Sequence, residues 1–400
     1  METHALTGGK AHRAGLTVAA ILALCGALLL GLAAGDAGAA KKKKAPKFNT
    51  MTRNVYLGAD LTPILQANNI NQAVDAGGEI SNQVDATNFP LRAKGLAAEI
   101  LSKNPDLVGL QEVAEWRTGP VDFGAVTNPS ASNVEYDFLQ LLLSELNKTG
   151  NNYEAVVVKQ EFDAEFPVND DGNGSGATGA DHNERLTMRD VILRRVNSKA
   201  KVSNPNSGTF NTLLRVSVAG VVSLDVTRGW TAVDVSLKGT KKFRFVNTHL
   251  EAFDSQGQNP TNTGTSLGKG DIRAAQAQEL VAAGGPADPA PKYTVILVGD
   301  LNSDDDTVQP NGDQNAYNAI LAAGFSERST ANPLSCCLND PNLVNGSQAD
   351  FDHQVDHILT DNKKVKLKSS SVTGTSPNSG LWDSDHEGVQ SLLKMPKKKK

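Results

Sequence analysis

Cysteine is scarce in this sequence, with three residues in 400. Cys25 lies inside an apolar run near the N-terminus, whereas Cys336 and Cys337 are adjacent and have no distant cysteine to join. This arrangement excludes a framework of loop-closing disulfides. The adjacent pair forms either a bond between neighbours or two reduced thiols, and neither alternative provides a catalytic nucleophile.

Aromatic residues are also few, at 5% of the chain. An enzyme that works on a lipid bilayer needs an exposed aromatic hairpin that enters the membrane surface. The sequence shows no such hairpin. The isolated aromatic residues Trp116, Phe123 and Trp230 are the remaining candidates for a membrane contact. The composition therefore disfavours a bilayer as the substrate.

Negative charge is concentrated in the body of the chain. The whole chain has a net charge of −5. Residues 1–47 carry +5 and the lysines at 397–400 carry +4, so the net charge of residues 48–396 is −14. An acidic body repels a polyanion such as DNA unless bound cations or a local basic patch reverse the field. The lysine tails act as solubilising ends, or they attach the protein weakly to an anionic surface.

The N-terminus has the pattern of a targeting segment. Lys10, His12 and Arg13 precede an apolar run at 16–34, and small residues follow up to Ala39. This order is typical of a secretory signal peptide at 1–39, and an uncleaved membrane anchor is the alternative. We therefore expect a secreted, monomeric protein with a basic linker at 40–47, a catalytic domain at 48–396 and a lysine tail at 397–400.

Strand-like and helix-like stretches alternate from Phe48 onward. Strands are expected at 48–57, 106–113, 153–159, 188–196, 211–226, 230–238, 242–249, 293–298, 355–360 and 388–393, and helices at 88–103, 134–148, 271–283 and 314–323. Polar loops are expected at 167–183 and 254–270. No internal repeat and no second composition occur within 48–396, which indicates one α/β domain.

Polar residues recur at the ends of these apolar strands. They are Glu112 after 107–111, His249 after 243–248, Asp300 and Asn302 after 295–299, Asp356 at the start of 356–359, and Asp385 and His386 just before 388–393. Taken singly, each has an ordinary explanation as a surface charge or a turn residue. If the strands lie side by side, however, these ends form one rim and the side chains converge.

The converging side chains suit hydrolysis with a hard cation. The carboxylates of Glu112 and Asp385 and the amide oxygen of Asn54 are ligands for Mg²⁺, with Mn²⁺ or Ca²⁺ as alternatives, and they match zinc poorly. An imidazole beside carboxylates orients or deprotonates water, and a second imidazole donates to a phosphoryl oxygen. Direct attack of water on phosphorus follows, without a Ser or Cys nucleophile.

The ordered motifs resemble the endonuclease/exonuclease/phosphatase superfamily, which includes deoxyribonuclease I. They are Thr52-Arg53-Asn54, Leu110-Gln111-Glu112-Val113, Val246-Asn247-Thr248-His249-Leu250, Gly299-Asp300-Leu301-Asn302-Ser303, Val355-Asp356-His357-Ile358 and Ser384-Asp385-His386. Single blocks are moderately specific, and all six in order are highly specific. The resemblance covers about 50–393 and implies a four-layer α/β/β/α sandwich, in which helices flank two mainly antiparallel sheets.

The resemblance also implies roles for the metal-binding residues. Glu112 is expected to bind the cation, and Asp385 completes the shell. Asn54 supports the cation or touches the scissile phosphate.

The same resemblance implies the catalytic roles. Asp300 is expected to position or deprotonate the water, and Asn302 to hold a phosphoryl oxygen. Asp356 orients His386, which acts on phosphate or water. His249 is the second imidazole, with Asp190 as the candidate for its acidic partner.

The expected function is that of a secreted, divalent-metal-dependent hydrolase of phosphoesters. Phosphodiesters are favoured, as in a nuclease, and the arginines that can contact nucleic acid are Arg189, Arg194, Arg195 and Arg228. The alternatives are a phosphomonoesterase, a sphingomyelinase-like phosphodiesterase, and a binding module on the same scaffold without catalysis.

Overall fold

Two β-sheets pack face to face in the part of the chain that the computed structural model describes, namely residues 45–220, 222–253, 270–289, 293–304, 314–329 and 334–398. The chain divides into two units, Met1–Lys43 and Lys44–Lys400, and the description here concerns the second. The predicted signal peptide, most of the basic linker and nearly all of the loop 254–270 lie outside the described residues. None of the described helices has the length and apolarity needed to cross a membrane.

The sheets have the following strands in spatial order. The first is eight-stranded, with β15 (Lys366–Thr373), β16 (Gly388–Lys394), β1 (Lys47–Asn54), β2 (Leu107–Gln111), β6 (His182–Arg195), β3 (Glu115–Gly119) and β4 (Asn133–Asp137), and β5 (Tyr153–Val168) also pairs with β6. The second is six-stranded, with β13 (Ser326–Glu327), β14 (Asp356–Thr360), β12 (Thr294–Asp300), β11 (Phe243–His249), β10 (Gly229–Ser236) and β7 (Lys201–Thr209). A separate hairpin consists of β8 (Leu214–Val218) and β9 (Val222–Val226).

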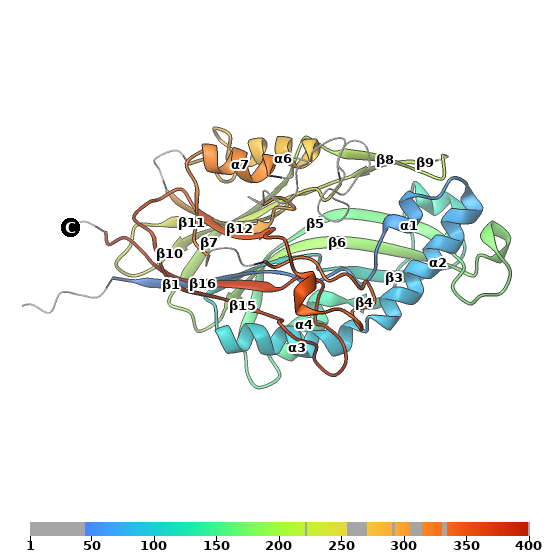
Figure 1. Cartoon of the computed structure of the whole chain (residues 1–400), viewed down its shortest axis with the longest axis horizontal. Helices are drawn as coiled ribbons and strands as arrows, with labels where there is room; N and C mark the ends of the chain where they lie inside the picture. The colour runs from blue at the N-terminus through green and yellow to red at the C-terminus, as the bar shows by residue number, and fades with distance from the viewer. Residues whose placement is uncertain are drawn as a thin grey trace, which may run out of the picture. The chain divides into compact units, whose positions relative to one another are not determined.

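Helices cover the outer faces of the two sheets (Figure 1). The helices are α1 (Thr62–Leu65), α2 (Ile70–Ala86), α3 (Phe89–Lys103), α4 (Phe138–Leu146), α6 (Asp271–Val281) and α7 (Asn315–Ala322), with short 3-10 turns η1 (Phe123–Val126), η2 (Gly176–Gly179) and η3 (Gln348–Asp350). One apolar core lies between the first sheet and α2 to α4, and another between the second sheet and α6 and α7. A third core fills the space between the sheets, where the ring of Phe48 lies 5.0 Å from that of Phe243. The predicted four-layer sandwich is confirmed.

Strand direction brings the polar strand ends together. Most pairs are antiparallel, as predicted, but β1 runs parallel to β2 and β11 runs parallel to β12. The parallel register places Asn54 beside Gln111 in one sheet and His249 beside Asp300 in the other. The antiparallel strand β14 adds Asp356 opposite Asp300. Each sheet therefore contributes one cluster of polar side chains at the same edge.

Several elements differ from the prediction. Strands β3, β4, β7 and β15 were not expected, and β4 occupies the first residues of the helix expected at 134–148. The strand expected at 211–226 is the hairpin β8–β9, because Ala219 and Gly220 have φ values of 55° and 69° and turn the chain. Helix α2 was not predicted, because its adjacent glycines Gly77 and Gly78 lower the helix propensity of the segment. These glycines allow α2 to pack closely on the end of β5, where a Cβ on Gly78 would lie 1.8 Å from the carbonyl oxygen of Asn169.

A buried arginine on α3 holds the two loops that carry the site. The guanidinium of Arg92 donates hydrogen bonds to the backbone carbonyls of Thr87, Val55, Tyr56 and Asp383 at distances of 2.8, 2.7, 3.2 and 3.1 Å. Val55 and Tyr56 follow Asn54, and Asp383 shortly precedes Asp385 and His386. Arg92 therefore links the first and last predicted site motifs.

Replacing this arginine should destabilise the fold. In Arg92→Met, buried carbonyl groups lose their donor, and we expect the free energy of unfolding to fall by at least about 3 kcal/mol. Chemical denaturation followed by circular dichroism measures the loss. The matched control Lys94→Met, at an exposed position on the same helix, should change stability by less than about 0.5 kcal/mol. Equal stability of both variants would contradict the role given to Arg92.

Candidate active site

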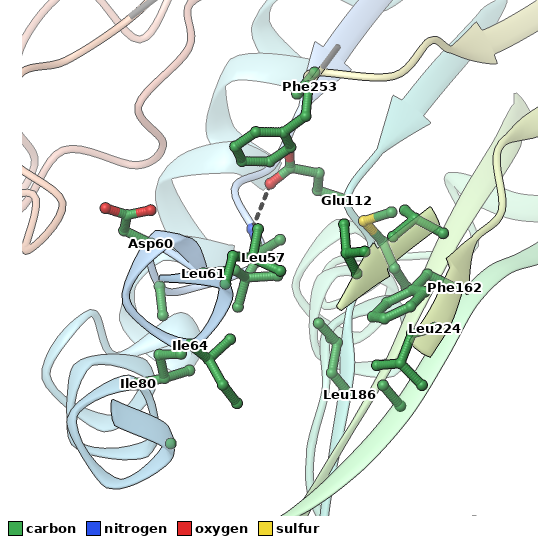
Figure 2. A pocket seen from close by; sticks show the side chains of 18 of the residues that line it. Leu57, Asp60, Leu61, Ile64, Ile80, Glu112, Phe162, Leu186, Leu224 and Phe253 are labelled. Carbon is green, nitrogen blue, oxygen red and sulfur yellow. Dashed lines mark hydrogen bonds between the residues drawn. The ribbon is translucent and has the colours of Figure 1, made fainter. Parts of the chain in front are cut away.

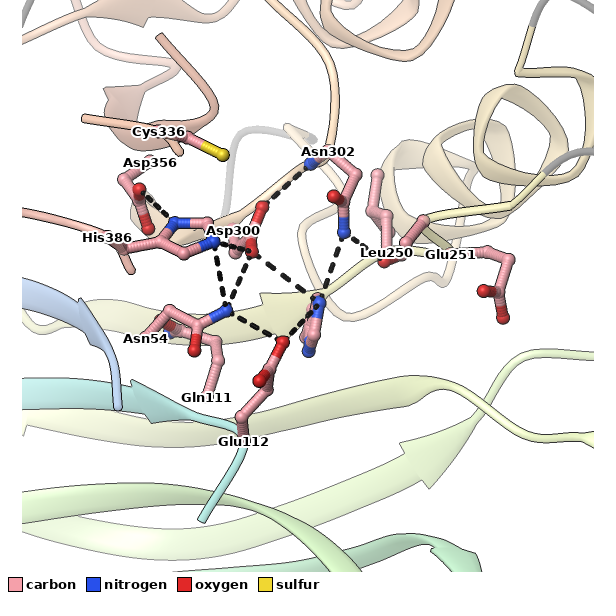
Figure 3. A network of polar contacts seen from close by, with 12 residues as sticks. Asn54, Gln111, Glu112, Leu250, Glu251, Asp300, Asn302, Cys336, Asp356 and His386 are labelled. Atoms are coloured by element: carbon pink, nitrogen blue, oxygen red, sulfur yellow. Dashed lines mark hydrogen bonds and ion pairs between the residues drawn. The ribbon is translucent and has the colours of Figure 1, made fainter. Parts of the chain in front are cut away.

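The side chain of Asn54 joins the two sheets at the polar edge (Figure 3). Its amide nitrogen donates to Oε1 of Glu112 at 3.0 Å and to Oδ2 of Asp300 at 3.0 Å. Its amide oxygen accepts from the backbone N–H of Tyr56 at 2.9 Å. Because a backbone N–H can only donate, the oxygen must face Tyr56. This orientation differs from the predicted ligand role, since the oxygen points away from the acids.

Glu112 projects from the residue that follows β2. Its φ of 56° is in the left-handed region, which a residue with a side chain adopts at a cost that functional sites often tolerate. Oε2 accepts from the backbone N–H of Leu57 at 2.8 Å, and Oε1 lies 4.0 Å from Nε2 of His249. The carboxylate is thus held in one orientation, facing the second sheet.

His249 is buried at the end of β11, with Arg228 on the Nδ1 side of its ring and the acids Glu112 and Asp300 on the Nε2 side. Nη1 of Arg228 lies 3.0 Å from its Nδ1, and Nε2 lies 3.5 Å from Oδ2 of Asp300. Burial, followed by the charges of Arg228 and His386, lowers the pKa of His249 well below its ordinary value. The imidazole is therefore neutral, and it faces the acids.

Asp190, the acidic partner expected for His249, makes no hydrogen bond or ion pair with it among the described residues. The carboxylate of Asp190 is buried and accepts no hydrogen bond there. Arg228, one of the four arginines named as able to contact nucleic acid, pairs with Glu251, with Nε 3.3 Å from Oε2. No local pattern indicates this pairing, because Arg228 lies in the loop before β10 and reaches His249 through the antiparallel register of β10 and β11.

Asp300 occupies the centre of the cluster. Its Oδ1 accepts from the backbone N–H of Asn302 at 2.9 Å, while Oδ2 faces Asn54, His249 and His386. Burial raises the pKa of Asp300 to about 6, with His386 opposing the rise and Asp356 adding to it. The amide of Asn302 lies 3.1 Å from Nε2 of His249 and donates to the carbonyl of Leu250 at 3.0 Å.

His386 and Asp356 form a buried pair. Nδ1 of His386 donates to Oδ2 of Asp356 at 2.8 Å, and Nε2 lies 3.7 Å from Oδ2 of Asp300. Burial lowers the pKa of His386, but Asp356, Asp300 and Asp385 outweigh it, so the pKa is well above the ordinary value. The ring is therefore cationic. Ser335, which the sequence did not single out, donates to Oδ2 of Asp356 at 2.8 Å.

Two features border this pair. The adjacent cysteines, predicted as bonded or reduced, are joined in a disulfide, and Sγ of Cys337 lies 4.0 Å from Nε2 of His386. Asp385 is buried, and its burial raises its pKa to about 6, with His386 opposing and Glu112 adding to the rise. Two tight groups of metal-competent atoms without cysteine lie at this site, namely Glu112 with His249 and Asp300, and Asp300 with Asp356 and His386. Asp385 belongs to neither group.

The donor set fits a hard divalent cation. Glu112, Asp300 and Asp385 are hard oxygen donors around one edge. Burial is the main cause of the raised pKa values of Asp300 and Asp385, and neighbouring carboxylates add to the rise. A cation between them would stabilise their ionised forms. Zinc is a poor match, since the oxygens outnumber the available nitrogens.

The arginines proposed for nucleic-acid contact are all engaged by acids. Arg189 pairs with Asp137 at 2.6 Å, Arg195 pairs with Asp106 at 2.6 Å, and Arg194 pairs with Glu154. With Arg228 on Glu251, none of the four offers a free guanidinium to a phosphate backbone. A basic track for nucleic acid is therefore not built from these residues.

Among solved structures, the chain is similar to an endonuclease/exonuclease/phosphatase family protein from Bacteroides thetaiotaomicron, with 15% identity and a TM-score of 0.49, over 88% of this chain and 99% of that one. It is similar to a mannosyl-6-phosphatase from the same organism, with 15% identity and a TM-score of 0.47, over 86% of this chain and 99% of that one. It is also similar to D. rerio TDP2 complexed with single strand DNA product, with 16% identity and a TM-score of 0.45, over 87% of this chain and 98% of that one. No curated protein matches the chain.

The sequence profile of the Endonuclease/Exonuclease/phosphatase family matches residues 54–386. This range begins at Asn54 and ends at His386, so it includes every residue predicted for the site. The resemblance inferred from the six motifs is confirmed, and the chain belongs to the endonuclease/exonuclease/phosphatase family.

Proposed function

We propose that this phosphoesterase is a divalent-metal-dependent hydrolase of phosphodiesters. The observation that carries the proposal is the position of Oδ2 of Asp300, which faces the amide of Asn54, the neutral ring of His249 and the cationic ring of His386. One carboxylate oxygen thus meets two imidazoles and an amide donor at the meeting point of two sheets. The set combines a base, proton donors and ligands for a hard cation.

Glu112, Asp385 and Asp300 would hold the cation, for which we propose Mg²⁺, with Mn²⁺ or Ca²⁺ as alternatives. When bound, it polarises a phosphoryl oxygen and neutralises the charge that develops there. Asn54 keeps Glu112 and Asp300 oriented, since its amide nitrogen bonds both acids at 3.0 Å.

The protein side chains complete the reaction. Asp300 accepts a proton from water, whose oxygen attacks phosphorus, and one P–O ester bond breaks to give a phosphomonoester and an alcohol that receives a proton. His386, held by Asp356 at 2.8 Å, donates to a phosphoryl oxygen or the leaving group. The ring of His249 and the amide of Asn302 donate to a second phosphoryl oxygen.

The charge of the protein groups at the site favours a diester over a monoester. A phosphomonoester is largely dianionic near neutral pH, whereas a phosphodiester carries one negative charge. The cationic side chains at the site, His386 and Arg228, already pair with Asp356 and Glu251. Apart from the proposed cation, little positive charge remains for a second negative charge on the substrate, so a singly charged diester fits better.

Secretion remains a proposal that rests on the sequence of residues 1–39. A scaffold that binds without catalysis is opposed by the complete set of acids and imidazoles, and measured turnover distinguishes the two proposals.

Removing one imidazole should impair turnover. With Mg²⁺ or Mn²⁺ and bis-p-nitrophenyl phosphate, His386→Ala should lower kcat by at least ~10²-fold, because the cationic donor is lost. The control His182→Ala alters a histidine in a different cluster, with Asp170 and Asp181, and should retain the wild-type rate. If wild-type protein cleaves no diester with either metal, the enzymatic proposal fails.

Removing one carboxylate should weaken metal binding, which can be measured independently of catalytic activity. Titration of the full chain with Mn²⁺ in a calorimeter should show an increase in Kd of at least about 10-fold for Glu112→Gln. Glu115→Gln provides the matched control, since Glu115 pairs with Arg117 and Arg189 away from the cluster. Equal affinity of all three proteins would exclude Glu112 as a ligand.

A further inference from the structure

An apolar cavity of about 390 Å³ lies beside the candidate active site (Figure 2). Its walls come from α1, α2, β5, β6 and β9, and the side chains that fill them include Leu61, Ile64, Ile80, Phe162, Leu186 and Leu224. The volume is within the range of roughly 300–1,000 Å³ that is typical of sites for small molecules. A space of this size lined with hydrocarbon is suited to an apolar ligand.

The cavity is continuous with the site of the proposed chemistry. Glu112, Asp385 and Arg228 line it together with the apolar residues, and Phe253 stands next to Glu112 (Figure 2). Glu112 and Arg228 also belong to the polar cluster through Asn54 and His249. A phosphodiester bound at Glu112 therefore has one of its substituents at the entrance of the cavity.

The hairpin β8–β9 closes one side of the cavity. Its residues alternate, so that Leu214, Val216 and Val218 line the cavity whereas Arg215 and Ser217 are exposed. Among the described strands, β8 and β9 pair only with each other. On the outer face Arg215 pairs with Asp225 at 2.6 Å. The hairpin is thus an amphipathic flap with an apolar inner face and a polar outer face.

The polar groups on the cavity wall select against a nucleic acid. The ionisable side chains that line it are acidic, namely Asp60, Glu112, Glu184, Glu251 and Asp385, apart from Arg228, which Glu251 holds. A polynucleotide needs unpaired cationic side chains along its backbone. A hydrocarbon chain needs only apolar surface, which this cavity supplies.

We infer that the substrate is a single-chain amphiphile, a phosphodiester in which one substituent is an alkyl or acyl chain that enters the cavity. The inference rests on the proposed function and names its substrate class. The phosphodiester lies against Glu112 and Asp300, and the chain extends past Phe162 and Leu224 beneath the hairpin. The size of the cavity suits one chain, which the enzyme takes as a monomer.

The test is a series of p-nitrophenyl alkyl phosphodiesters with ethyl, butyl and octyl chains, used as monomers with Mn²⁺. Burial of each methylene strengthens binding, so kcat/KM should rise by at least about 30-fold from ethyl to octyl, mainly through KM. In Leu224→Asp, a charge replaces apolar surface inside the cavity, and the octyl-to-ethyl ratio should fall toward one. Because the ratio is measured on one preparation, partial unfolding does not alter it.

The matched control is Ser223→Asp, which places the same charge on the exposed face of the same strand and should keep the wild-type ratio. The inference would be overturned if active wild-type enzyme showed the same kcat/KM for the ethyl, butyl and octyl diesters. An octyl-to-ethyl ratio that stays unchanged in Leu224→Asp would also overturn it, as would a higher kcat/KM for a DNA oligonucleotide than for the octyl diester.

A binding measurement separates this inference from the proposed function. Octylphosphocholine is itself a single-chain phosphodiester, and calorimetric titration below its critical micelle concentration should show binding to the wild type and weaker binding to Leu224→Asp. Binding without hydrolysis of any diester would refute the proposed function and leave the cavity assignment standing. Hydrolysis of bis-p-nitrophenyl phosphate without binding of octylphosphocholine would refute the cavity assignment alone.

Discussion

Four carboxylates are gathered where the ends of two sheets meet, and the arrangement of the site depends on keeping them there. Glu112, Asp300, Asp356 and Asp385 lie in a region of low dielectric, where an ionised group is costly unless it is paired. His386 offsets part of the charge, bonded to Asp356 and close to Asp300. Amide and backbone donors offset more, at Asn54 and Leu57. The carboxylates leave negative charge that these groups do not neutralise. A divalent cation bound between them would neutralise it.

Much of this geometry was predictable because its sequence signals are local. Apolar runs that end in Glu112, His249 and Asp300 mark strand ends, and two parallel pairs place those ends at one edge. What the sequence could not show depends on contacts between distant segments. Helix α2 was missed because Gly77 and Gly78 weaken a helix signal, while their purpose, close packing on β5, is visible only in three dimensions.

The polar partners of the site residues were predicted less well, for the same reason. His249 was expected to pair with Asp190, whereas its Nδ1 lies 3.0 Å from Arg228 and its Nε2 lies 3.5 Å from Asp300. The amide of Asn54 was expected to offer its oxygen to the cation, yet the N–H of Tyr56 takes that oxygen. Residue type suggests which chemistry a side chain can perform, but the direction of each donor depends on which backbone group lies opposite. Sequence patterns contain no information on that direction.

The apolar cavity shows how substrate choice can be hidden in ordinary patterns. Phe162, Leu186 and Leu224 each belong to a strand whose alternation is typical of core packing, and only their common orientation reveals a space between them. The scarcity of aromatic residues argued against action at a bilayer, and a cavity that accepts one chain makes such insertion unnecessary. The charge of −14 on residues 48–396 repels a polyanion. The same charge has little effect on a zwitterionic or singly charged diester, since the apolar chain provides most of its binding free energy. Charge, composition and cavity therefore select one substrate class, in which hydrocarbon supplies the affinity and the acid cluster acts on the phosphorus.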